Sequence, residues 1–340
     1  WVPYTSFFEQ GPALSGSSNA DTAAVPARVP GSVQQSLLEA GVIPNWNVGM
    51  NSRLCEWVEN RHWVLEARIP DEWVESGKQT RLNCLGLDYS GWVYVNDRLA
   101  GEFRGTHIPH VFDLSCHLRP GSNTLSIIFD CPPRWLGVSG FTSRIRDWKP
   151  RFNYTWDWTV RLVQTGVWDS IALEVSDGLE LCDVRCTTAF DPAAGLGKIR
   201  LKARVPSSRT GLRAAVTLEK EGRVIRRAEY PAGRIANGLT WSGLHVEPWW
   251  PNLSGPPNAA PALYTLRVVL LTAEGAVEDQ VERRVGFRQI AWSPCEKAPE
   301  GADFWLCSVN GTPIFLRGVN WTPIRPNFAD VTDADYRLRI

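Results

Sequence analysis

The sequence has little of what membrane or nucleic-acid binding requires. No apolar run approaches the ~20 residues that a membrane-spanning helix needs. The 36 basic and 36 acidic residues cancel, and neither sign gathers into the basic face that binds phosphates or anionic lipids. We therefore expect neither nucleic acid nor a membrane as a partner. The oligomeric state stays open.

The sequence also lacks closely spaced pairs of cysteines. The eight cysteines are scattered without a CxxC pair, which is not the pattern of a dense disulfide framework. His107, His110, Cys116 and His117 come nearest to a metal-ligand cluster. Their spacing matches no strong zinc pattern, and the segment is also typical of a strand edge and turn. We expect no metal and no cofactor. Single disulfides and the cellular compartment stay open.

Methionine is scarce and tryptophan abundant, at 1 against 17 residues. Large aromatic side chains fill the cores of β-sandwiches, and flat rings also cover the apolar faces of sugars, so the count alone does not decide between packing and recognition. A chain of 340 residues with 44% hydrophobic content can form more than one core, and two domains are the natural expectation.

Short strands dominate the first half of the chain. A helix is expected after Ser32, because Gln35 completes a capping box and Gly41 suits the left-handed position after a helix end. Beyond it the pattern predicts strands over residues 63–69, 111–114, 124–129 and 168–175. Such spacing is typical of a sandwich or jelly roll.

A second antiparallel block follows a boundary near residues 176–178. Apolar and polar residues alternate strictly over 199–205, as in a half-buried strand. Further strands turn at Glu221–Gly222 and continue through 264–271. The block has the size of an immunoglobulin-like sandwich.

The last segment has a different pattern. Phe304 to Val309 begins a hairpin that turns at Asn310–Gly311. Residues 314–320 form a nearly continuous apolar run, typical of a strand buried on both faces in a parallel barrel, and Thr332 begins a helix. We therefore expect an all-β chain: a jelly roll over 1–176, an immunoglobulin-like sandwich over 177–290, and, over 291–340, the first strand of a truncated (β/α)8 barrel.

Four segments read VPGSV at 29–33, WKPRFNYTWDW at 148–158, PWWPNL at 248–253 and FLRGVNWTP at 315–323. In this order they resemble segments of glycoside hydrolase family 2, and the second and fourth resemble its β-mannosidases. In the second, Trp148 stands where the β-mannosidases have arginine, Thr155 where they have glycine, and Thr159-Val160 where they have Gly-Pro. These departures leave the exact sugar open.

The resemblance implies a retaining mechanism with two carboxylates about 5 Å apart, one acting as acid and the other as nucleophile. In the family both are glutamates late in the barrel, so no catalytic residue is assigned here, and the segment alone is expected to be inactive. The implied function is the N-terminal portion of an exo-glycosidase that hydrolyses terminal β-mannosides. Alternatives are an exo-glucosaminidase, a glucuronidase, or a non-catalytic carbohydrate-binding protein.

The resemblance also implies residues that bind the sugar. Asp157 would accept hydrogen bonds from sugar hydroxyls, and Trp156 would form an apolar wall. Trp321 would stack on the sugar, and Asn320 would brace the site, since functional side chains sit at the C-terminal ends of barrel strands. The alternatives are that Asp157 caps local backbone and that both tryptophans only pack. Arg161 would form an interdomain salt bridge or touch the substrate.

Overall fold

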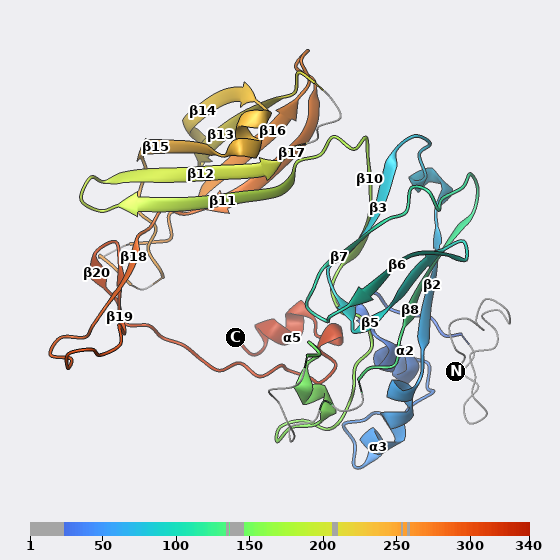
Figure 1. Ribbon diagram of the computed structural model, residues 1–340. Helices are drawn as coiled ribbons and strands as arrows, with labels where there is room; N and C mark the ends of the chain where they lie inside the picture. The colour runs from blue at the N-terminus through green and yellow to red at the C-terminus, as the bar shows by residue number, and fades with distance from the viewer. Residues whose placement is uncertain (1–23, 134–135, 137–145, 206–209, 253, 257–258) are drawn as a thin grey trace. The chain divides into compact units, whose positions relative to one another are not determined.

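The computed structural model describes residues 24–340 except 134–135, 137–145, 206–209, 253 and 257–258. The chain forms two compact units (Figure 1). One comprises Trp1–Ser176 together with Trp321–Ile340, and the other comprises Asp177–Asn320. Strands dominate the described part of both units, so the all-β expectation is confirmed. Among the described residues, no helix combines the length and the apolarity needed to cross a bilayer.

The first unit is a sandwich of two antiparallel sheets, with the strand orders β2-β8-β5-β6 and β10-β3-β7. A short third sheet, β1-β9-β4, lies beside them. The core between the two main sheets is formed by Leu82, Val93, Phe103, Ile127 and Phe129 with their neighbours. The strands are β1 (Gly31–Ser32), β2 (Trp63–Ile69), β3 (Gln79–Cys84), β4 (Leu87–Asp88), β5 (Ser90–Val95), β6 (Arg98–Arg104), β7 (His110–Asp113), β8 (Asn123–Phe129), β9 (Gly166–Val167) and β10 (Ile171–Ser176).

The predicted helix is α2 (Val33–Glu39), and the Ser32 cap and the Gly41 ending are confirmed, whereas the Gln35 side chain bonds Glu39 and does not complete the expected capping box. Ser32 caps the N-terminus by accepting a hydrogen bond from the Gln35 backbone N–H. Gly41 has a φ of 72°, and the N–H of Val42 donates to the carbonyl of Leu37, a Schellman ending. The other short helices of this unit are α3 (Asn51–Cys55), η1 (Glu56–Asn60), η2 (Asp71–Trp73), η4 (Arg151–Tyr154), η5 (Phe328–Asp330) and α5 (Asp333–Arg337).

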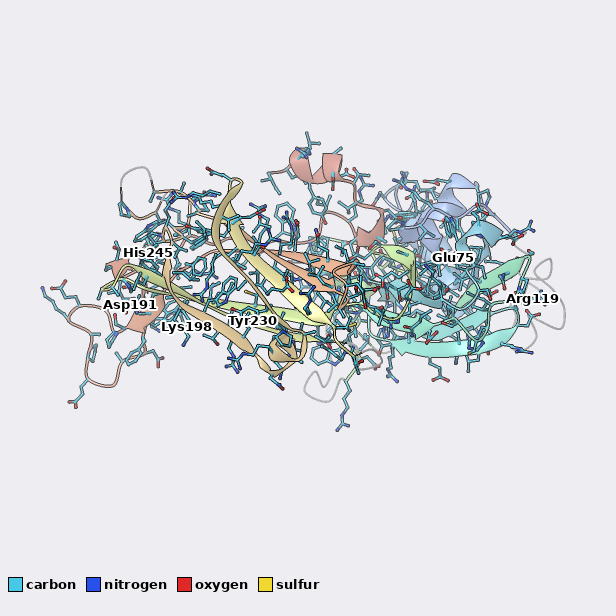
Figure 2. The ribbon with its side chains drawn as sticks, turned by 90° about the horizontal axis from the view of Figure 1, so that it is seen from above. Glu75, Arg119, Asp191, Lys198, Tyr230 and His245 are labelled. Atoms are coloured by element: carbon cyan, nitrogen blue, oxygen red, sulfur yellow. The ribbon has the colours of Figure 1, made fainter. Side chains whose placement is uncertain are left out.

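The second unit is also a sandwich, with sheets β11-β12-β15 and β14-β13-β16-β17. Its core surrounds Trp241, Leu218, Leu266 and Phe287. The alternation of buried and exposed residues predicted over 199–205 is confirmed in β12. Lys198 of this strand and Asp191 of the neighbouring β11, both labelled in Figure 2, are exposed. The elements are β11 (Cys182–Asp191), β12 (Leu196–Arg204), β13 (Arg213–Lys220), β14 (Arg223–Pro231), α4 (Gly233–Asn237), β15 (Leu239–His245), β16 (Tyr264–Leu271) and β17 (Val277–Val285).

A small sheet, β18-β19-β20, ends the second unit. Its strands are β18 (Ile290–Ser293), β19 (Leu306–Val309) and β20 (Thr312–Pro313). The predicted turn is confirmed, because Asn310 and Gly311 have φ values of 50° and 80°.

The expected barrel strand over residues 314–320 is not formed in the described chain. Ile314 donates one backbone hydrogen bond to Cys307, and no strand continues beyond it. Phe315 and Val319 are 82% and 86% exposed, not buried on two faces. An apolar run indicates a tendency to be buried, but a strand forms only where a neighbouring backbone pairs with it.

Candidate functional site

The segment that resembles the sugar-binding motif forms a short, closed loop. The 3₁₀ helix η4 (Arg151–Tyr154) ends at Thr155, and the backbones of Trp156 and Thr159 exchange two hydrogen bonds of 3.4 Å. We call residues 155–159 the Trp-Asp-Trp loop. Its neck is closed where the Leu162 N–H donates to the Asn153 carbonyl over 2.9 Å. The loop therefore projects its central side chains from a fixed base.

Aromatic packing holds the base of this loop. The ring of Trp158 lies 5.5 Å from that of Phe152 and is half-buried. The Tyr154 ring is buried, its hydroxyl donates to the Pro133 carbonyl, and burial raises its pKa above the usual range. Trp158 and Tyr154 thus pack the loop rather than presenting polar groups to a ligand.

Two of the four residues predicted to bind sugar lie at the exposed tip. Trp156 is 46% exposed, and Asp157 is also exposed. No hydrogen bond or ion pair among the described residues involves the Asp157 carboxylate, so it does not cap local backbone here. The loop therefore offers an apolar ring and a carboxylate side by side in the sequence.

Thr155 carries backbone strain at the start of the loop. Its φ is 103° and its ψ is 148°, a region that side chains with a branched Cβ rarely adopt. The position is one where the resembling enzymes have glycine, so the substitution places a β-branched residue where glycine fits better.

Arg161, for which an interdomain salt bridge or a substrate contact was expected, makes its described contacts within the first unit. Its guanidinium pairs with Glu59 of η1 and lies 5.1 Å from the ring centre of Tyr154, all within the first unit. Desolvation raises the pKa of Glu59 and the Arg161 hydrogen bond lowers it, with a net upward shift. Arg161 therefore braces the loop base internally.

A buried ion pair, which sequence reasoning missed, lies below the loop. Lys149 Nζ lies 2.6 Å from Asp88 Oδ1, and both side chains are fully buried. The carboxylate also accepts hydrogen bonds from Thr106 and Gln164, and Lys149 donates to the Gln164 carbonyl. Burial lowers the pKa of Lys149, while the nearby Asp88 acts in the opposite direction. Such a pair is tolerated only when its remaining hydrogen bonds are made, as they are here.

Residues 326–330, which we call the docking segment, lie against this network. The Ala329 N–H donates to Gln164 Oε1 over 2.8 Å, and Asn153 Nδ2 donates to the Pro326 carbonyl over 2.7 Å. The segment follows Trp321, which is 49% exposed and stacks on Tyr336 with ring centres 6.4 Å apart. The first unit thus contains three predicted site residues, Trp156, Asp157 and Trp321. Asn320 belongs to the second unit and is exposed.

The residues that invited a zinc interpretation do not form a cluster. His107 packs on the rings of Trp168 and Phe328, whereas His110 packs on Phe103 and Phe112.

Among the described residues, a different group has ligand atoms within 4.8 Å of one another: His62, Asp130 and Cys131. The β2–β8 register brings it together, since Trp63 pairs with Phe129. Hydrogen bonds to Asp130 and Cys131 raise the pKa of His62 to about 9. A protonated imidazole must lose its proton before it can bind a metal, so we interpret the group as an ion pair.

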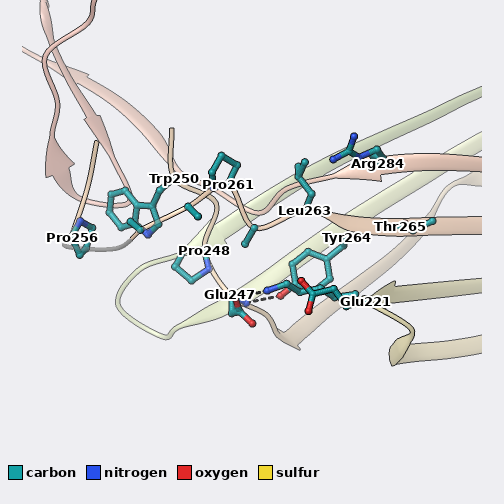
Figure 3. Close-up of a pocket in the computed structure, with 14 residues that line it drawn as sticks. Glu221, Glu247, Pro248, Trp250, Pro256, Pro261, Leu263, Tyr264, Thr265 and Arg284 are labelled. Carbon is teal, nitrogen blue, oxygen red and sulfur yellow. Dashed lines mark hydrogen bonds and ion pairs between the residues drawn. The ribbon is translucent and has the colours of Figure 1, made fainter. Parts of the chain in front are cut away.

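Two cavities were not indicated by the sequence. In the second unit a cavity of about 710 Å³ is lined by Trp250 and by charged side chains, two of which form an ion pair (Figure 3). There Lys220 Nζ lies 2.5 Å from Glu247 Oε2. In the first unit an apolar cavity of about 1090 Å³ opens beside β2 and β10 and includes Trp63 and Leu173. Neither contains a predicted site residue.

Comparison with known families and proteins agrees with the architecture. Residues 14–169 match the galactose-binding domain-like module of glycosyl hydrolase family 2, and residues 179–288 match a second module described as glycosyl hydrolases family 2. The crystal structure of a β-D-mannosidase from Dictyoglomus thermophilum superposes with a TM-score of 0.78 at 24% identity, covering 94% of this chain and 40% of that one. An exo-chitosanase from Amycolatopsis orientalis superposes at 0.66 and 17% identity, covering 95% and 36%.

Curated relatives give the same result. Beta-mannosidase B of Emericella nidulans is 26% identical over 95% of this chain and 39% of its own length. Beta-mannosidase of Mus musculus is 23% identical over 93% and 38%. The chain thus spans about two fifths of the length of these relatives. With two modules of one family in order along most of its length, and β-mannosidases among its relatives, the chain belongs to glycoside hydrolase family 2 and is β-mannosidase-like.

Proposed function

We propose that this chain is the substrate-recognising front portion of a retaining exo-glycosidase that hydrolyses terminal β-mannosides. In this proposal the two catalytic carboxylates lie outside residues 1–340. Such enzymes hold them about 5 Å apart, one as the acid and the other as the nucleophile. The similarity to β-mannosidases over more than nine tenths of the chain supports the choice of sugar.

The observation that carries the proposal is the exposed tip of the Trp-Asp-Trp loop. A carboxylate that makes no bond within the described protein is ready to accept hydrogen bonds from two neighbouring hydroxyls of a sugar, and charge-assisted bonds are the stronger kind. Trp156 beside it presents a flat apolar face that can cover the C–H groups of a pyranoside. Trp321 would supply a second face and Asn320 a hydrogen-bonding brace. The chain's partner would thus be a carbohydrate.

The test is hydrolysis of p-nitrophenyl β-mannoside by the full-length protein, beside the matching β-glucoside, β-galactoside, β-glucuronide and β-glucosaminide. We expect turnover of the mannoside and a loss of about 100-fold or more in kcat/KM for Asp157→Ala, since the variant removes charge-assisted bonds to the sugar. Asp71→Ala is the matched control, because Asp71 is an exposed carboxylate at η2 in the same unit. Full activity of the Asp157 variant would contradict the assigned role.

A second candidate is an exo-glucosaminidase. It is favoured by the departures from the β-mannosidase pattern beside Asp157, at Trp148, Thr155 and Thr159. An exposed carboxylate would also pair with the ammonium group of glucosamine. Turnover of the glucosaminide with none of the mannoside would select it. A third candidate, a non-catalytic carbohydrate-binding protein, is selected if the full-length protein binds sugars and cleaves none of the five substrates.

A further inference from the structure

We propose that Asn153 is a positioning residue for sugar recognition, which holds the loop that carries Asp157 in register with the docking segment that follows Trp321. The inference rests on the proposed function, because it concerns how two of its sugar-binding side chains are held. Asn153 does not itself contact the sugar in this proposal. Asn153 acts through two segments: the loop, whose neck its backbone carbonyl closes, and the docking segment, to which its side-chain amide donates.

The contacts of Asn153 join two segments that are far apart in the sequence. The residue is fully buried, with an exposed fraction of 0%. Its backbone carbonyl accepts a hydrogen bond from Leu162 and closes the neck of the Trp-Asp-Trp loop. Its side-chain amide donates to the carbonyl of Pro326, 173 residues further along the chain. One residue therefore fixes the base of the loop and reaches the docking segment.

The docking segment is itself firmly held to the sandwich. The Asp330 carboxylate accepts hydrogen bonds from the backbone N–H and the hydroxyl of Ser32, at 2.9 and 2.6 Å. The Phe328 ring lies 6.1 Å from Phe152 and 5.5 Å from Trp168. Together with the hydrogen bond from Ala329 to Gln164, these contacts fix the position of the docking segment on the sandwich. The segment can therefore fix the position of the residues before it, which include Trp321.

Contacts within residues 321–336 also hold Trp321 close to the docking segment. Its ring stacks on Tyr336, and Arg325 pairs with Asp335 over 2.6 Å, so residues 321–336 fold back on themselves around the docking segment. Asp157 and Trp321 thus lie on two pieces of chain joined through the Asn153 amide. A displacement of about 1 Å between groups that bind one substrate can reduce the rate about 100-fold.

The orientation of the Asn153 amide follows from its partner. A carbonyl can only accept, so the group facing Pro326 must be the NH2. Among the described residues, Asn153 Oδ1 is buried without a hydrogen-bond partner. An isosteric carboxylic acid at this position could donate to Pro326 only while protonated. The position therefore offers a pH-dependent test as well as a truncation.

The first experiment is a double-mutant cycle in the full-length enzyme, with Asn153→Ala and Asp157→Ala and with kcat/KM for p-nitrophenyl β-mannoside as the readout. We expect Asn153→Ala alone to lower kcat/KM about 10- to 100-fold. In the Asp157→Ala background it should cost less than about threefold, because a residue that acts through Asp157 has nothing left to position.

Asn123→Ala is the matched control. Asn123 is equally buried, but its hydrogen bonds go to Asn96, Arg119 and Gly121 at a turn of the sandwich. It should lower the melting temperature and leave kcat/KM of the folded enzyme within about twofold. A purely structural role for Asn153 would give the same result as this control. Equal losses in both Asp157 backgrounds would also overturn the inference.

The second variant, Asn153→Asp, keeps the shape of the side chain and guards against a failure of the alanine variant to fold. Burial raises the pKa of a carboxyl group, so activity should approach the wild-type value at low pH and decline as the introduced group ionises. A pH profile of kcat/KM parallel to that of wild type would refute the role.

Absence of turnover of any of the five glycosides by the wild type would refute the proposed function and this inference together, whereas an active wild type with unaffected variants refutes this inference alone.

Discussion

At the scale of single residues, Thr155 is the clearest case of a residue type that does not suit its backbone conformation. A φ of 103° is unfavourable for a β-branched residue. We predict that Thr155→Gly raises the free energy of unfolding by about 1 kcal/mol, because relief of strain exceeds the entropy that glycine adds to the unfolded chain. Urea unfolding of the chain measures it.

The control for this prediction is Thr159→Gly in the same loop. Thr159 is not among the residues with positive φ, so glycine there should lower stability by about 0.5–1 kcal/mol. If both substitutions lower stability alike, Thr155 is not strained.

His62 gives a residue-scale prediction about pH. Its bond to Asp130 raises the folded pKa from 6.5 to about 9. The stabilisation is therefore fully present below about pH 6.5 and is lost as the pH rises through about 9. Melting temperatures across this range should fall in wild type and fall less in His62→Gln. His245→Gln, an exposed histidine labelled in Figure 2, should keep the wild-type slope.

At the scale of elements, the start of α2 depends on a residue at the other end of the chain. In a capping box the residue three positions on would return a bond to the Ser32 N–H. Here Gln35 bonds Glu39 instead, and Asp330 accepts from Ser32. We predict that Asp330→Ala lowers the free energy of unfolding by about 1–3 kcal/mol, as expected for hydrogen bonds to a charged acceptor.

Chemical denaturation of this variant beside Ser32→Ala and the double variant measures the coupling. The double variant should lose less than the sum of the single losses, since both substitutions remove the bond from the Ser32 hydroxyl to Asp330. Asp333→Ala is the control, because Asp333 is exposed at the start of α5. Simple additivity would mean that the bond from the Ser32 hydroxyl to Asp330 contributes nothing to stability.

The same elements show what the sequence could predict. Local signals were reliable: the turn at Asn310–Gly311 and the cap at Ser32 depend on neighbouring residues. The run over 314–320 was wrong as a strand, because pairing depends on a partner that no local pattern names.

The candidate site divides in the same way. The Trp-Asp-Trp loop was recognisable from its own residues. The contacts that hold it were not, because Asn153 and Pro326, like Asp88 and Lys149, meet only after the chain has folded. Ordinary polar residues at such positions carry no local signal of burial.

At the scale of the whole molecule, the described chain has separate cores in its two units. Leu82 on β3 belongs to the first unit's core and Leu266 on β16 to the second's, and both are almost completely buried. Each unit has its own core and the size of an independent domain.

We predict two calorimetric unfolding transitions for the 340-residue chain, with Leu82→Ala and Leu266→Ala each lowering the melting temperature of a different transition. Each deletion removes buried methyl groups and should cost about 2–5 kcal/mol, which for units of this size corresponds to roughly 2–4 °C per kcal/mol. If both variants instead lower one common transition by the same amount, the two sandwiches unfold as one cooperative unit. In that case stability measured at Asn153 or Asp330 would report on the whole chain rather than on the first unit alone.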